Sequence, residues 1–167
     1  MQPLAPPDSH HLNAAEGWLE LGLRDEARAE LERIAPEFQR HPDVLEMRWE
    51  VYVNERQWEA ALDVARKLLI SAPQRTSGWL SHAYALRRVP GGSLEKAAEA
   101  LRPAVERFPK EPIIPYNLSC YACQMRQLDE ARVWLRRAFL IGNKERIKQQ
   151  ALADEDLRPL WEEIRQL

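Results

Sequence analysis

The sequence predicts an all-α protein built from stacked helix pairs, and three observations agree on this. The chain of 167 residues contains only six glycines, which is few for a fold rich in tight hairpins. Alanine, leucine, glutamate and arginine dominate the composition, and all four favour helices. Four segments resemble one another at a spacing of 34 to 36 residues, a period typical of helical repeats.

The second helix of each pair carries the repeat most clearly. Its four copies read RDEARAELERI, WEAALDVARKL, LEKAAEALRPA and LDEARVWLRRA. They align on four alanines that are 34, 36 and 34 residues apart: Ala27, Ala61, Ala97 and Ala131. Small or apolar residues follow each alanine at four and seven positions, so every copy is predicted to form an amphipathic helix.

A first helix precedes each copy, and a short turn joins the two. The first helices carry small or apolar residues three positions apart: Ala15 and Trp18, Trp49 and Tyr52, Ala83 and Leu86, Ser119 and Ala122. The turns contain Gly22, Arg56, the loop 89–92 and Arg126. The two extra residues of the third unit fall in that Gly- and Pro-containing loop, where insertions cost little free energy.

The pattern resembles the tetratricopeptide repeat family, over residues 9–142. That family favours a large residue at position 4, small at 8, aromatic at 11, small at 20 and proline at 32. Trp79, Ala83 and Trp18 match the first three positions, the alanine series matches position 20, and Pro73 and Pro109 match position 32. The resemblance implies a right-handed α-solenoid of four helix-turn-helix pairs.

The expected organisation has three parts. Residues 1–8 form an extended leader, residues 9–142 form four units (about 9–41, 42–75, 76–111 and 112–142), and residues 143–167 form a helical cap. A solenoid needs such a cap because its last apolar face would otherwise be bare. We expect a helix over 144–153, then a short helix capped by Asp154 that carries Leu157, Leu160, Trp161 and Ile164. The phrase ALADEDLRPLW is similar to tails of many bacterial proteins of this family.

Several residues depart from the family pattern. Pro36 and Pro103 lie late in second helices and are expected to kink or end them, whereas Pro115 fits a first helical turn. Trp49 occupies a small position, so its helix pair must splay or its ring must turn outward. The remaining repeat-position tryptophans are expected to pack in the core: Trp18, Trp58, Trp79 and Trp134.

Composition excludes several classes of protein. The net charge is −2, whereas nucleic-acid binders usually carry a basic excess. No apolar run approaches the ~20 residues that span a bilayer, and the N-terminus lacks the features of a secretory signal. With only two cysteines, no disulfide framework is expected. These features favour a cytoplasmic protein without nucleic-acid or membrane partners.

No residue pattern supports catalysis, so we expect a non-enzyme with no catalytic residue, metal or cofactor. Cys120 and Cys123 form a C-x-x-C, but no second such pair accompanies it and the position is mid-helix, which favours packing over redox or zinc chemistry. The histidines lack metal-site spacing. The acidic run 154–156 lacks the calcium-loop pattern, and helix capping explains it.

The family resemblance implies a concave groove lined by the first helices of successive pairs. The residues carried over to that groove are Leu12, Glu16, Glu20, Asp43, Glu46, Glu50, Asn54, Leu80, Tyr84, Arg87, Arg88, Ile113, Tyr116, Cys120, Cys123 and Gln124. Its charge changes from acidic to basic and aromatic, and Tyr beside Arg is typical of interface hot spots. Ordinary solvated charges are the competing interpretation.

The resulting hypothesis is an adaptor that binds a peptide or helix of a partner protein in this groove. The ligand would be basic at Glu46 and Glu50 and acidic at Arg87 and Arg88. The family's clamp for a C-terminal carboxylate is excluded, because Leu12 and Glu16 stand at its Lys and Asn positions. The alternative is a homo-oligomer that assembles head to tail, because residues 1–72 have a net charge of −6 and residues 73–167 of +4.

Overall fold

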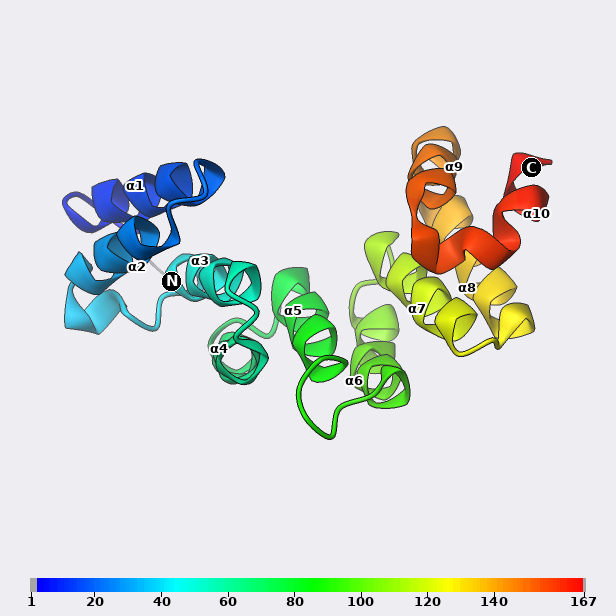
Figure 1. The fold of residues 1–167 in the computed structure, drawn as a ribbon, viewed down its shortest axis with the longest axis horizontal. Helices are drawn as coiled ribbons and strands as arrows, with labels where there is room; N and C mark the ends of the chain where they lie inside the picture. Colours follow the sequence, from blue (N-terminus) through cyan, green and yellow to red (C-terminus); the bar gives the residue numbers. More distant parts are fainter. Residues whose placement is uncertain (1–2, 167) are drawn as a thin grey trace. The chain divides into compact units, whose positions relative to one another are not determined.

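The computed structural model describes residues 3–166, which contain helices and connecting segments and no β-strand (Figure 1). The chain forms two compact units, Met1–Val89 and Pro90–Leu167. The first unit contains α1 (Asp8–Glu20), α2 (Arg24–Arg33), the 3₁₀ turn η1 (Pro36–Phe38), α3 (Pro42–Asn54), α4 (Trp58–Ser71) and α5 (Thr76–Leu86). The second contains α6 (Leu94–Arg107), α7 (Ile113–Gln124), α8 (Leu128–Ile141), α9 (Lys144–Ala153), η2 (Glu155–Leu160) and α10 (Trp161–Arg165).

The predicted repeat alanines lie at the centres of the helix packing. All four of Ala27, Ala61, Ala97 and Ala131 are fully buried. Within the units, α1 packs on α2, α3 on α4, α4 on α5, α6 on α7 and α7 on α8. A methyl side chain lets two helix backbones approach closely, so the alignment on these alanines correctly identified the packed faces.

The turns α1–α2, α3–α4 and α7–α8 and the loop between α5 and α6 each contain one residue in the left-handed region. Gly22 has φ = 78°, Gly91 has 73°, Arg56 has 57° and Arg126 has 61°. These residues lie in the turns expected from the sequence. Glycine adopts this conformation without steric cost, whereas the two arginines adopt it at a cost of about 1 kcal/mol or somewhat more.

The boundary between the two units falls in the loop that the sequence assigned to the third pair. Val89 ends the first unit and Pro90 begins the second. Helices α5 and α6, which the sequence pairs within residues 76–111, therefore belong to different units. The pairs α1–α2, α3–α4 and α7–α8 are observed within the units, and the α5–α6 pair stays a prediction.

The N-terminal leader is shorter than expected, because α1 already begins at Asp8. The Asp8 side chain is buried, and its Oδ1 accepts a hydrogen bond from the Ala35 N–H at 2.7 Å. Leu4 packs against the core of the first unit. These contacts attach the start of α1 to the end of α2, although residues 1–2 lie outside the described range.

The prolines behave differently from one another. Helix α2 ends at Arg33, before Pro36, which instead opens the turn η1. Pro103 does not end α6, which continues to Arg107, because proline removes only one backbone donor and this ring faces solvent. Pro115 lies in the first turn of α7, as expected.

The C-terminal segment follows the prediction closely. Helix α9 spans the expected residues, and the Asp154 side chain accepts a hydrogen bond from the Asp156 N–H, which caps η2. Leu157, Leu160 and Ile164 are 0–1% exposed. The segment is thus part of the core of the second unit.

All four tryptophans of the first unit retain some solvent exposure, and Trp58 and Trp79, which were predicted to pack in the core, are half-buried. Trp18 is 37% exposed, so its prediction as a core residue is wrong; no earlier helix pair covers this ring in the described residues. Trp49 is half-buried and packs against side chains of α4 and α5. Its indole N–H is buried without a hydrogen-bond partner in the described part of the chain. None of the helices within residues 3–166 has both the length and the hydrophobicity needed to cross a bilayer.

Candidate functional site

The predicted groove residues of the first unit lie on α1, α3 and α5, except Arg87 and Arg88, which directly follow α5. Glu16, Glu20, Glu50 and Asn54 are exposed. The others are half-buried: Leu12, Asp43, Glu46, Leu80, Tyr84, Arg87 and Arg88. All therefore retain some solvent-accessible surface, as a binding face requires.

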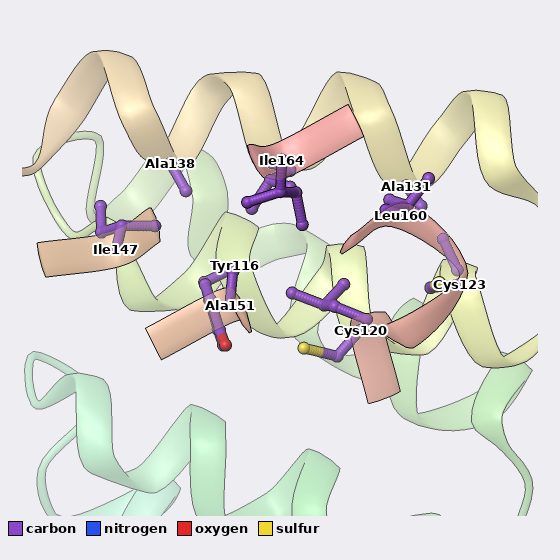
Figure 2. Packing of buried hydrophobic residues seen from close by; sticks show 12 residues of the cluster. Tyr116, Cys120, Cys123, Ala131, Ala138, Ile147, Ala151, Leu160 and Ile164 are labelled. Carbon is purple, nitrogen blue, oxygen red and sulfur yellow. The ribbon is translucent and has the colours of Figure 1, made fainter. Parts of the chain in front are cut away.

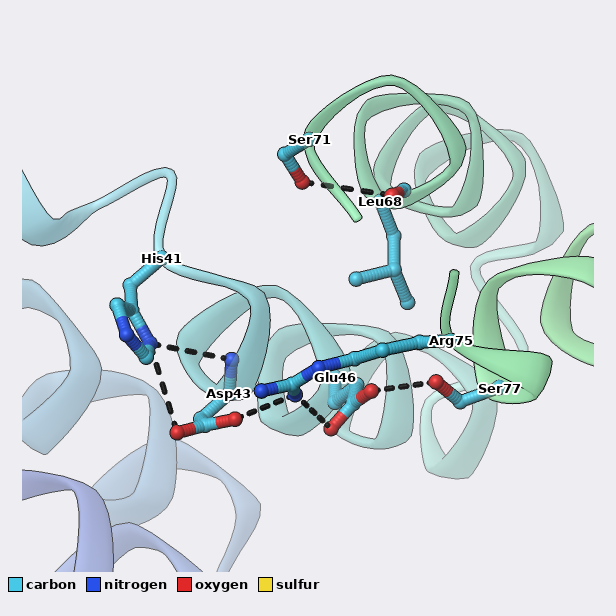
Figure 3. A network of polar contacts seen from close by, with 7 residues as sticks. All are labelled: His41, Asp43, Glu46, Leu68, Ser71, Arg75 and Ser77. Carbon is cyan, nitrogen blue, oxygen red and sulfur yellow. Dashed lines mark hydrogen bonds and ion pairs between the residues drawn. The ribbon is translucent and has the colours of Figure 1, made fainter. Parts of the chain in front are cut away.

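Two of the predicted acidic residues already form ion pairs with one arginine, Arg75, which the sequence analysis missed (Figure 3). The Arg75 guanidinium donates to Asp43 Oδ1 and, at 3.1 Å, to Glu46 Oε2. Ser77 Oγ donates to the other Glu46 oxygen. These contacts attach the start of α5 to α3, so Asp43 and Glu46 serve the fold of the unit first. No local sequence pattern marks this pairing, because Arg75 lies 32 residues from Asp43 and 29 from Glu46 along the chain.

A second group of carboxylates lacks such partners. No ion pair within the described residues involves the side chains of Glu16, Glu20 or Glu50. Partial burial raises the pKa of Glu50, and the like charges of Glu16 and Glu46 raise it further. Residues on α1 and α3 thus form a surface whose negative charge is only partly compensated.

An aromatic cluster lies beside this surface, between α3, α4 and α5. The Tyr84 ring packs edge-on against Trp49, with centroids 5.7 Å apart, and lies 6.3 Å from the Trp58 ring. The Arg88 guanidinium sits 3.5 Å from the centroid of Tyr84 and 5.1 Å from that of Trp58. It also donates to the Tyr84 carbonyl oxygen at 2.9 Å. Arg88 is therefore held by its own chain, and its availability to an acidic ligand is reduced.

The fourth predicted repeat, residues 112–142, differs most from the expected groove, because the C-terminal segment covers its first helix, α7 (Figure 2). Tyr116, Cys120 and Cys123 are only 2–4% exposed. They share one buried cluster with Ala151, Leu157, Leu160 and Ile164. The prediction that these three residues line an open groove is thus wrong for this structure, because η2 packs on the face of α7 that carries them. Ile113 and Gln124 remain half-buried.

Asp154 holds this cover in place. Its Oδ2 accepts hydrogen bonds from Tyr116 Oη at 2.9 Å and from Cys120 Sγ at 3.5 Å, while Oδ1 accepts from the Asp156 N–H at 3.0 Å. Burial, followed by nearby negative charge, raises the pKa of Cys120 and of Cys123. Thiols that stay protonated are poor nucleophiles.

The same residues provide the one group of possible metal ligands found in residues 3–166: Cys120, Asp154 and Asp156 lie with ligand atoms within 4.8 Å of one another. Both Asp154 oxygens already accept protein hydrogen bonds, so capping and docking of the C-terminal segment account for its position. The contacts favour a structural role for the group.

Comparisons with known proteins agree on the fold. The sequence matches no protein-family model and no curated protein. A thermophilic TPR protein of Thermus thermophilus aligns with a TM-score of 0.68 and 19% identity, over 96% of this chain and 100% of its own. A MamA RS-1 double mutant aligns with a TM-score of 0.67 and 17% identity, over 81% of this chain and 75% of its own. MamA of MSR-1 aligns with a TM-score of 0.62 and 18% identity, over 78% of this chain and 74% of its own.

At identities this low the matches establish the fold and not the activity. The observed helix pairs, the buried alanine series and these structural matches together show that the chain has the tetratricopeptide repeat fold.

Proposed function

We propose that this protein is a non-enzymatic interaction module that binds a basic segment of a partner protein on the first-helix face of its first unit. The fold is one that serves protein interaction and scaffolding in general, which supports the class. The cytoplasmic location expected from the composition belongs to the same proposal.

The observation that carries the proposal is the pair of uncompensated carboxylates, Glu16 on α1 and Glu50 on α3. Like charges held close together destabilise each other, and a cationic side chain placed between them removes that repulsion. Asp43 and Glu46 contribute less, because Arg75 already pairs with both. Tyr84 contributes less as well, because Arg88 already stacks on its ring and Trp49 packs edge-on against it.

The structure favours a smaller range of ligand charges than the sequence suggested. An acidic portion was expected opposite Arg87 and Arg88, but the Arg88 guanidinium stacks on Tyr84 and Trp58 of its own unit. A partner segment rich in arginine or lysine therefore fits this unit better than one of mixed charge.

Fluorescence anisotropy with a labelled peptide of alternating arginine and alanine tests this proposal. We expect the protein to bind this peptide and not its glutamate counterpart, with affinity that falls as salt rises. A Glu16→Gln, Glu50→Gln variant should bind at least about tenfold more weakly, a loss of about 1.4 kcal/mol.

Glu32→Gln, Glu59→Gln is the matched control, because it also removes two negative charges, from exposed positions on α2 and α4, the second helices of their pairs. Equal weakening by the control and the Glu16/Glu50 variant would mean that net charge, and not this face, attracts the peptide, and the proposal would fail.

The alternative, head-to-tail self-association through oppositely charged halves, is less favoured once the units are known. Arg75, Arg87 and Arg88 belong to the first unit, which has 11 basic and 14 acidic residues and a net charge of −3. The second unit has 13 basic and 12 acidic residues, a net of +1. A molecular mass that rises with concentration and falls with salt would favour this alternative.

A further inference from the structure

The second unit contains a hollow that the C-terminal segment leaves open, between the start of α7 and one face of α9. Its volume is about 270 Å³, and its lining comes from Pro112, Ile113, Tyr116, Asn143, Arg146, Ile147 and Gln150. The hollow is smaller than the ~300–1,000 Å³ typical of small-molecule sites, and it suits one or two side chains of a peptide.

Two helices build this hollow from regularly spaced residues. Ile113 and Tyr116 are three residues apart in the first turns of α7, and Asn143, Ile147 and Gln150 follow one face of α9 and its cap. Residues at these spacings share a helix face. The hollow is thus a feature of helical surface and not of a loop.

Gly142 brings the two helices together at one end of the hollow. A Cβ atom at this position would lie 2.7 Å from Ile147 Cδ1 and 2.9 Å from Pro112 Cβ. Such distances are shorter than van der Waals contact, so only glycine permits this approach. Because Pro112 and Ile147 both line the hollow, the close approach helps to shape it before any ligand binds.

The chemistry of the residues that line the hollow indicates which kind of ligand would fit it. Pro112, Ile113 and Ile147 provide an apolar floor, and Arg146 is the single charged residue among the lining residues. The Arg146 side chain is exposed and forms no ion pair within residues 3–166. The Tyr116 hydroxyl is turned to Asp154. The Gln150 amide is exposed and can donate a further hydrogen bond.

We infer that this hollow binds a partner segment in which an apolar side chain stands next to a side-chain carboxylate. The apolar side chain enters between Ile113 and Ile147, and the carboxylate pairs with the Arg146 guanidinium, which has a geometry suited to a bidentate contact. The site differs in charge from the acidic face of the first unit and does not depend on it. It also gives α9 a second role, since this helix both caps the repeats and forms half of a binding surface.

Nuclear magnetic resonance titration of the full chain with three peptides tests this inference. The probe is a short glycine-serine peptide with a central Leu-Glu-Leu, compared with Leu-Gln-Leu and Gly-Glu-Gly counterparts. We expect amide shifts at Ile113, Arg146, Ile147 and Gln150 with the first peptide, and at least tenfold weaker binding of the other two.

Two charge-reversal variants separate the site from general electrostatics. Arg146→Glu should weaken binding of the Leu-Glu-Leu peptide at least tenfold, whereas Arg158→Glu, an exposed residue of η2 outside the lining, should leave it unchanged. Both positions are exposed, so circular dichroism should show unaltered helicity.

Shifts that map outside the hollow, equal binding of the glutamine peptide, equal loss in the two variants, or no binding at all would overturn the inference. Light scattering of the chain alone provides a further check. Self-association that Arg146→Glu abolishes would identify a second copy of the chain as the occupant of the hollow. That result would also overturn the inference that a segment of a partner protein binds there.

Discussion

At the scale of single residues, contacts within the fold decide which of several similar carboxylates remain available to bind a partner. Asp43, Glu46 and Glu50 all belong to α3, and the sequence assigned all three to one groove. Arg75 pairs with the first two and leaves Glu50 without a cation. The difference depends on where the start of α5 lies beside α3, which no periodicity reveals.

Glu50 provides a prediction about pH. Because burial and the charges of Glu16 and Glu46 raise its pKa above the ordinary 4.5, the folded state holds this proton more tightly than the unfolded state does. The negative charge of Glu50 therefore costs stability at neutral pH, and this cost disappears as the pH falls below the ordinary value. Glu50→Gln should stabilise the protein at neutral pH by less than about 1 kcal/mol, because the side chain is exposed and screened.

Thermal unfolding at neutral pH and below pH 4.5 checks this prediction. The advantage of the variant should shrink at the lower pH, while Glu59→Gln should show no comparable change. A Glu50→Gln protein that is less stable than wild type at neutral pH would show that Glu50 has a favourable partner.

At the scale of elements, small residues set how closely helices pack. The repeat alanines do this between paired helices, and Gly142 does it where the start of α9 meets the start of α7. The sequence revealed the alanines because they recur. Gly142 occurs once, so only its neighbours in space show its role.

Gly142→Ala should destabilise the protein by about 1–3 kcal/mol, the usual cost of overpacking, because the new methyl group would meet Ile147 and Pro112. Gly17→Ala is the control. Gly17 lies inside α1, and nothing lies within 4 Å of the position that its new methyl group would take, so alanine should stabilise the helix by about 0.5–1 kcal/mol. Urea unfolding measures both, and an unchanged midpoint for Gly142→Ala would mean that α9 moves to accommodate the methyl group.

At the scale of the whole molecule, the chain consists of two compact units, and the C-terminal segment belongs to the core of the second. Leu157, Leu160 and Ile164 are fully buried with residues of α7 and α8. The Arg132 guanidinium adds two contacts to Glu163, at 2.6 and 2.8 Å. The cover over Tyr116 and Cys120 therefore belongs to the core of the second unit, and we expect it to unfold together with α7 and α8 rather than to open separately as a lid.

Leu160→Ala tests this conclusion and should cost about 2–5 kcal/mol, as expected for truncation of a buried leucine. Native-state hydrogen exchange should show lower protection in α7, α8 and the C-terminal segment together. Val133→Ala is the control, since Val133 on α8 is 61% exposed. Loss of protection in the C-terminal segment alone would indicate a separately opening lid.

The sequence by itself determined the helical class, the repeat, the turns and the C-terminal cap. Local rules govern these features: helix propensity, the spacing of apolar residues along one face, and the capping carboxylate of Asp154. Alanines 34 to 36 residues apart are visible without coordinates because the same small residue is needed at the same packed position of each repeat.

Only the tertiary structure decided which predicted surface stays open. Tyr116, Cys120 and Cys123 occupy groove positions in the repeat pattern, yet η2 packs over them, more than 30 residues later in the chain. Their burial, the pairing of Arg75 with Asp43 and the hollow beside Arg146 all depend on contacts between elements distant in sequence. A pattern within one helix carries no information about which distant segment will cover it.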